Sequence, residues 1–103
     1  MTNDNLGMLL VGHGTRDERG VAEFLELAEL VKNRLPAVVV EAGFLELAVP
    51  SIGDALVKLV ERGVTDIVVS PLLLFAAGHA KQDIPDEVAR AAAPFKHLNL
   101  RQA

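Results

Sequence analysis

The hydrophobic positions of the chain alternate between short continuous runs and longer stretches with helical spacing. Residues 7–11 form an apolar run of strand length, which ends at the glycine-flanked His13. From Asp17 to Leu35, apolar residues recur at every third or fourth position with charged residues between them, which predicts an amphipathic helix. The two patterns then repeat, and they predict strands within 37–44, 65–74 and 97–100 and helices over 50–62 and 84–93.

Prolines and capping residues set the expected boundaries of these elements. Pro36 ends the first helix, Pro50 suits the first turn of the second, and Gly63 suits its C-terminal cap. Pro71 cannot donate a hydrogen bond within a sheet, so we expect the third strand to end or bend there. Asp83 can cap the third helix, which we expect to begin at about residue 84.

The regular alternation of strands and helices predicts an α/β domain with a doubly wound parallel sheet and helices on both faces. We expect four strands in the order 2-1-3-4, so that the first strand lies between the second and the third. A chain of 103 residues allows one domain, and we assign residues 1–103 to it. The sequence stops shortly after the fourth strand, where a doubly wound domain usually adds a helix, so we expect that C-terminal helix to be missing.

The amino-acid composition excludes several classes of function. The formal net charge is −4 and Tyr and Trp are absent, which argues against binding to nucleic acid or to an anionic membrane. The chain has no Cys, which excludes thiolate chemistry and disulfides. The polar start of the sequence does not resemble a signal peptide, and no apolar run is long enough to span a bilayer. We therefore expect a cytoplasmic protein.

Candidate chemistry gathers where the predicted strands end. His13 follows the first strand, Glu46 the second and His79 the third. Ligands of open α/β sheets bind at the carboxyl ends of the strands, where the strand order reverses, so we expect these three side chains at one edge. Two imidazoles and one carboxylate suit a divalent first-row metal such as Co, Fe, Ni or Zn. Glu41 lies close enough in sequence to remain an alternative to Glu46.

Other residues have weaker claims to a function. Arg16, Arg19 and Lys81 lie near the same edge and together could attract an anionic substrate. The apolar run 72–77 either packs in the core or lines a pocket or a dimer face. His97 opens the fourth strand at the opposite end of the sheet, and we expect it to be an ordinary surface residue.

Three segments carry a resemblance to a known family: LVGHGTR at 10–16, EAGFLE at 41–46 and PLLLFAAGHAKQDIP at 71–85. They closely resemble the class II chelatases of the CbiX type, the sirohydrochlorin cobaltochelatases and their ferrochelatase relatives. The resemblance implies a flavodoxin-like domain that inserts Co²⁺, or Fe²⁺ or Ni²⁺, into sirohydrochlorin. The metal is then a substrate, and no prosthetic group is expected. By the same resemblance, His13, Glu46 and His79 are the metal-binding and catalytic residues.

The tetrapyrrole substrate gives further residues a candidate role. Sirohydrochlorin carries many carboxylates, which Arg16, Arg19 and Lys81 could bind, and Phe75 could contact its ring. Short members of the family continue into a C-terminal helix and work as homodimers, so we expect a homodimer here. Leu27 and Leu30 exceed what one small core needs and could lie in its interface.

Two alternatives remain open at this point. Histidine phosphatases also place a His-Gly pair after the first strand, but their chemistry needs Arg directly before that His, where this chain has Gly12. The other alternative is a non-catalytic module that binds a metal or a tetrapyrrole, or that only dimerises.

Overall fold

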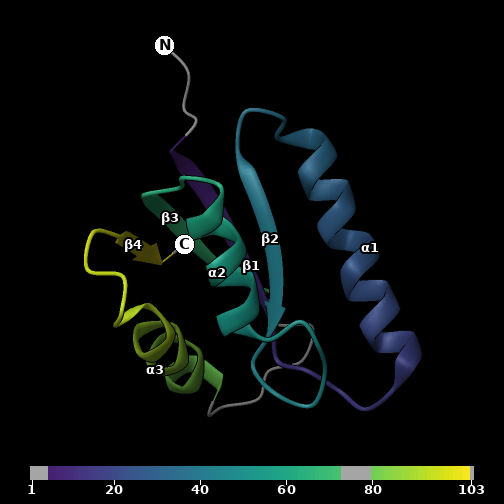
Figure 1. The fold of residues 1–103 in the computed structure, drawn as a ribbon. Coiled ribbons are helices and arrows are strands. Elements are labelled where there is room, and N and C mark those ends of the chain that lie inside the picture. The colour runs from purple at the N-terminus through teal and green to yellow at the C-terminus, as the bar shows by residue number, and fades with distance from the viewer. Residues whose placement is uncertain (1–4, 73–79, 103) are drawn as a thin grey trace.

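The structure is a computed structural model that describes residues 5–72 and 80–102, with side chains described for 5–72 and 83–102. Strands and helices alternate along the chain (Figure 1). The elements are β1 (Leu6–Gly12), α1 (Glu18–Arg34), β2 (Val39–Phe44), α2 (Ile52–Glu61), β3 (Asp66–Leu72), α3 (Ala80–Ala92) and β4 (Asn99–Gln102).

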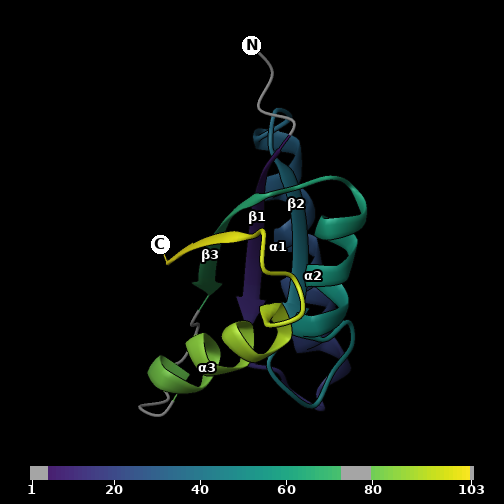
Figure 2. The same ribbon diagram turned by 60° about the vertical axis from the view of Figure 1, so that its left-hand side comes forward.

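The strands form one parallel sheet in the order β2-β1-β3-β4, which confirms the predicted topology. β1 lies in the centre and pairs with β2 up to Gly12↔Phe44 and with β3 up to Gly12↔Leu72. Figure 2 shows the arrowheads of β1 and β3 pointing the same way. The carboxyl ends of β1, β2 and β3 therefore lie at one edge of the sheet.

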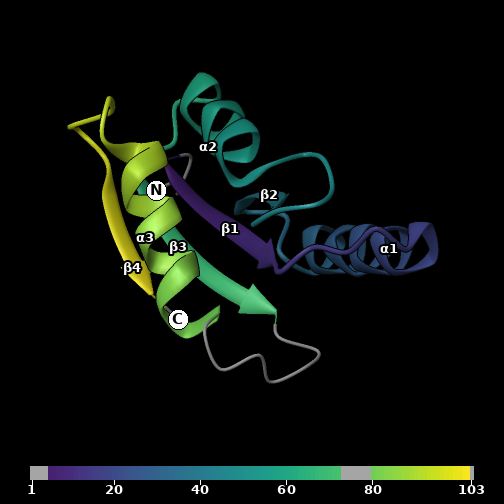
Figure 3. The same cartoon turned by 90° about the horizontal axis from the view of Figure 1, so that it is seen from below.

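Helices cover both faces, and each face has its own core. Figure 3, which views the sheet from the edge where the strands stop, shows α1 and α2 on different sides of β2. Buried side chains of α1 pack with Leu10 and Phe44, whereas α2 and α3 pack with Leu9, Val11 and Ile67. The buried residues of the helices are Phe24, Ala28, Ile52, Ala55, Leu56, Leu59, Ile84, Val88 and Ala92. Among the described residues, no helix has both the length and the apolar character needed to cross a membrane.

The start of α2 corrects the expectation for Pro50. Pro50 lies before the helix, and Ser51 is the N-cap. The Ser51 hydroxyl accepts a hydrogen bond from the Asp54 N–H at 3.0 Å, and the Asp54 carboxylate accepts one from the Ser51 N–H at 3.1 Å. This capping box satisfies two backbone donors at once, so the helix starts at Ile52, two residues after Pro50, rather than at Pro50 itself.

Two further boundaries differ from the sequence-based expectation. β3 continues through Pro71 to Leu72, because β4 pairs only with Asp66–Val69 and leaves the end of β3 with a partner on one side. α3 begins at Ala80, so Asp83 lies in its first turn rather than at its cap, and Pro85 lies inside the helix. The hydrogen bond that Pro85 cannot donate would go to the carbonyl of residue 81, near the start of the helix, where its loss disturbs few other bonds.

Candidate metal site

His13 and Glu46 meet at the edge where β1 and β2 end. His13 follows β1 directly, and Glu46 lies two residues beyond β2, the neighbouring strand. The Nε2 atom of His13 lies 3.6 Å from the Oε2 atom of Glu46. The side chains are 33% and 56% exposed, so both are accessible to a metal ion or a larger substrate.

Hydrogen bonds between the two loops extend the parallel ladder beyond the strand ends. The Leu45 N–H donates to the Gly12 carbonyl at 2.8 Å, and the Glu46 N–H donates to the His13 carbonyl at 3.2 Å. These backbone hydrogen bonds therefore place His13 and Glu46 side by side. Glu41, the alternative carboxylate, lies inside β2 and is half-buried, and its register partner in β1 is Leu9.

The two side chains form a close pair without a direct hydrogen bond. At 3.6 Å the nitrogen and the oxygen are beyond the usual hydrogen-bond distance. An imidazole nitrogen and a carboxylate oxygen are ligands that a divalent first-row ion accepts, so this pair could contribute to holding such an ion. The other ring nitrogen, Nδ1, is buried without a hydrogen-bond partner among the described residues, so Nε2 is the atom that faces the open side.

Three of the predicted site residues cannot be placed. His79 and Phe75 lie outside the described residues, together with the rest of 73–79, and the side chain of Lys81 is also outside them. Within 5–72 and 80–102, no three His, Asp or Glu side chains gather to hold a metal ion. The sequence-based prediction that His79 joins His13 and Glu46 as a third ligand therefore stays a prediction.

The two arginines lie on the segment that leads from His13 into α1. Arg16 is exposed in the loop, and Arg19 is exposed in the first turn of the helix. Asp17 caps this helix by accepting a hydrogen bond from the Arg19 N–H at 3.0 Å, and its own N–H donates to the Thr15 hydroxyl at 3.1 Å. In the part of the chain that the structure describes, neither guanidinium forms an ion pair, so both are available to an anionic ligand.

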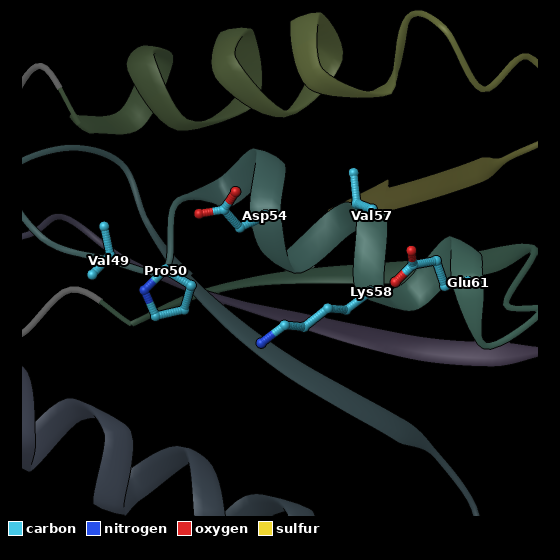
Figure 4. Close-up of a pocket in the computed structure, with 6 residues that line it drawn as sticks. All are labelled: Val49, Pro50, Asp54, Val57, Lys58 and Glu61. Atoms are coloured by element: carbon cyan, nitrogen blue, oxygen red, sulfur yellow. The ribbon is translucent and has the colours of Figure 1, made fainter.

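An open cavity of about 560 Å³ lies beside α2 (Figure 4). Its lining combines the exposed Val49 and Val57 with three charged side chains of α2 and with Pro50. The charged residues are Asp54, Lys58 and Glu61. Neither His13 nor Glu46 lines this cavity, so the cavity is separate from the His13–Glu46 pair.

Two backbone features of the site carried no signal in the sequence pattern. Leu47, directly after Glu46, has a positive φ of 67°, which a leucine seldom adopts. Gly14 has a φ of 108°, whereas the sequence showed only that glycines flank His13. A leucine in the sequence does not predict a left-handed backbone. The glycine at position 14 permits one, but the sequence does not show that the Glu46 carbonyl lies against it.

Comparison with known proteins gives consistent matches over nearly the whole chain. The CbiX family model matches residues 7–103. The chain is 39% identical over 93 residues to the sirohydrochlorin ferrochelatase of Bacillus subtilis, covering 90% of this chain and 36% of the relative. It is 43% identical over 83 residues to the sirohydrochlorin cobaltochelatase of Sulfolobus acidocaldarius, covering 81% of this chain and 66% of the relative.

A solved structure extends the similarity to the fold. The sirohydrochlorin chelatase SirB from Bacillus subtilis subspecies spizizenii, crystallised in complex with cobalt, superposes with a TM-score of 0.86 at 39% identity. The match covers 99% of this chain and 42% of that one. The chain thus spans about two fifths of the SirB chain and about a third of the Bacillus ferrochelatase.

Proposed function

The chain belongs to the CbiX family, and from that premise we propose that it takes part in inserting a divalent metal ion into sirohydrochlorin. The observation that carries the proposal is the pairing of His13 Nε2 and Glu46 Oε2, 3.6 Å apart at the carboxyl edge of the sheet. The chain matches relatives named ferrochelatase and relatives named cobaltochelatase, so the matches include enzymes named for iron and for cobalt. We assign Co²⁺ as the first candidate ion.

The chemistry requires a metal to be held and protons to be removed. As one divalent ion enters the ring, two pyrrole N–H bonds break, the nitrogens bind the ion and two protons leave. His13 and Glu46 hold the ion before transfer, and His79 is the third residue that we assign to this task. A neutral imidazole or a carboxylate can also accept the released protons. Nitrogen and oxygen ligands without thiolate suit an ion that must be given up again.

The substrate has more than one contact in this proposal. The exposed Arg16 and Arg19 attract its carboxylates on the side where α1 begins, and Lys81 adds a third positive charge. Phe75 contacts the ring. A tetrapyrrole is broad, so we further propose that a second copy of the chain closes the cleft in a homodimer. We assign the reaction to the cytoplasm, since a chain without Cys suits a reducing compartment.

The test is a turnover assay with sirohydrochlorin and Co²⁺, read from the visible spectrum of the tetrapyrrole and corrected for the rate without protein. We expect the wild-type chain to accelerate insertion and His13→Ala to return the rate to the uncatalysed value. His97→Ala is the matched control, because His97 is exposed and lies before β4, at the opposite edge of the sheet.

The alternative outcomes are informative. A chain that binds sirohydrochlorin or Co²⁺ but does not accelerate insertion would be the non-catalytic binding module considered from the sequence. Full turnover by His13→Ala would remove His13 from the mechanism. The phosphatase alternative has no support in the family match, and Gly12 stands where that chemistry needs Arg.

A further inference from the structure

We propose that Gly14 is a positioning residue for His13 and Glu46, which we call the metal pair. Because Gly14 has no side chain, the Glu46 backbone can lie directly against it. This contact sets where the Glu46 carboxylate lies relative to His13. The inference rests on the proposed function, because it assumes that His13 and Glu46 hold the ion. It adds a residue that itself contacts neither the metal nor the tetrapyrrole.

The contact between Gly14 and Glu46 admits no side chain. A Cβ atom built on Gly14 would lie 1.7 Å from the Glu46 carbonyl oxygen and 2.8 Å from its carbonyl carbon. Both obstacles are backbone atoms, so no change of rotamer can relieve the clash. The φ of 108° at Gly14 is a second and separate reason for glycine, since L side chains rarely adopt it.

The Glu46 peptide is held from two directions. Its N–H donates to the His13 carbonyl at 3.2 Å, and its carbonyl oxygen lies against Gly14, the next residue along the same loop. The Leu45 N–H is fixed in the same way by the Gly12 carbonyl at 2.8 Å. Residues 12–14 thus form a backbone template for residues 45–46.

The chain changes direction immediately after this contact. Leu47 takes a positive φ of 67°, and its side chain is 50% exposed. A left-handed backbone is unfavourable for a leucine, whose Cβ then lies too close to the following carbonyl oxygen. The segment around Glu46 therefore adopts a specific, partly unfavourable path, and the template of residues 12–14 is what holds it there.

A methyl group at position 14 would misplace the carboxylate. Real Cβ atoms essentially never approach a neighbour closer than 3.0 Å. The Glu46 carbonyl would have to retreat by roughly 1.3 Å, several times the tolerance of about 0.2 Å that metal–ligand distances allow. The two ligands could then no longer share one ion in their present arrangement.

The experiment titrates Co²⁺ alone into the wild type, Gly14→Ala and Gly53→Ala, and records the visible d–d absorption of the bound ion. Gly53 is the matched control, because a Cβ there would meet the Ser51 hydroxyl oxygen at 3.7 Å, an ordinary van der Waals distance. We expect Gly14→Ala to lose about tenfold or more in Co²⁺ affinity and to change the spectrum. We expect Gly53→Ala to behave as the wild type does. An unchanged affinity and spectrum for Gly14→Ala would overturn the inference.

A double-mutant cycle separates positioning from a general structural effect. If Gly14 acts through Glu46, Glu46→Ala should weaken Co²⁺ binding in the wild-type background and cause no further loss in the Gly14→Ala background. Equal losses in both backgrounds would overturn the inference. If Glu46→Ala has no effect even in the wild type, the metal pair itself is wrong, and the proposed function loses its main support.

Amide hydrogen exchange of the wild-type protein keeps the inference falsifiable even if Gly14→Ala does not fold. The template predicts that the N–H groups of Leu45 and Glu46 are protected in the absence of metal, because both donate to the loop after β1. Exchange of the Glu46 amide at the rate of an unstructured peptide would show that the two loops are not held together, and would overturn the inference.

Discussion

The ring of Phe24 in α1 packs against the ring of Phe44 at the end of β2, with their centroids 4.8 Å apart and their planes inclined by 51°. Both side chains are buried, at 4% and 2% exposure. Phe44 directly precedes the segment that carries Glu46, and its N–H donates to the Pro50 carbonyl at 2.8 Å. This contact therefore connects the packing of α1 to the loop that carries the candidate carboxylate.

Removing one ring should destabilise the protein strongly. Phe24→Ala is expected to lower the free energy of unfolding by about 3 kcal/mol or more, because it leaves a cavity beside Phe44 and under Gly12. Leu30→Ala, a 59% exposed position on the same helix, should change it by no more than about 0.5 kcal/mol. Urea unfolding followed by circular dichroism measures both, and similar losses for the two variants would contradict this account of the α1 core.

The two carboxylates that the sequence left open can be distinguished by metal binding. Glu46→Gln should weaken Co²⁺ binding by about tenfold, equivalent to about 1.4 kcal/mol, because it removes a charged ligand opposite His13. Glu41→Gln should leave the affinity unchanged, since Glu41 lies inside β2 rather than at its end. Calorimetric titration with Co²⁺ provides the comparison. A larger loss for Glu41→Gln would reverse the assignment.

The third ligand remains a prediction from the sequence. We expect His13 and His79 to approach each other closely, because they follow neighbouring strands. X-ray absorption of the Co²⁺-loaded protein should then show two imidazole ligands in the wild type and one in His79→Ala. His79→Ala should also abolish metal insertion with little change in the free energy of unfolding. An unchanged number of imidazoles would exclude His79 from the site.

Self-association can be tested on the outer side of α1. Leu30 is 59% exposed, and Leu27 on the same helix is partly buried. If this side lies in a dimer interface, light scattering at tens of micromolar should report a dimer for the wild type, and Leu30→Glu should shift it toward the monomer. A monomeric wild type with full activity would show that one copy suffices for the reaction.

The order of elements and the sheet topology followed from the sequence because each strand and helix has its own hydrophobic period. Leu9 and Val11 face one core and Leu10 the other, which accounts for the continuous apolar run of a strand covered on both sides. The exact boundaries of the helices were harder to predict from the sequence. Both Pro50 and Ser51 can begin a helix, and only the reciprocal bonds with Asp54 select Ser51.

The candidate site was predictable in its residue types but not in its geometry. A position at the end of a strand predicted that His13 and a carboxylate, Glu46 or Glu41, would lie close together, because parallel strands end at one edge. The 3.6 Å separation of their side chains depends on the loop path around Gly14 and Leu47, which no pattern of polar and apolar residues encodes. The sequence showed a glycine at position 14, but not that the Glu46 carbonyl would lie against it.

The direction of the strands has a practical consequence for measurement. β1 enters the sheet at Leu6, at the edge opposite His13, and at about 3.3 Å per residue it separates the two by about 20 Å. Figure 2 shows the start of β1 on the side away from the arrowheads of β1 and β3. A chain immobilised ahead of Leu6 on a biosensor surface would therefore present the metal pair to the flowing solution, and metal and tetrapyrrole binding could be followed there without obstruction by the linker.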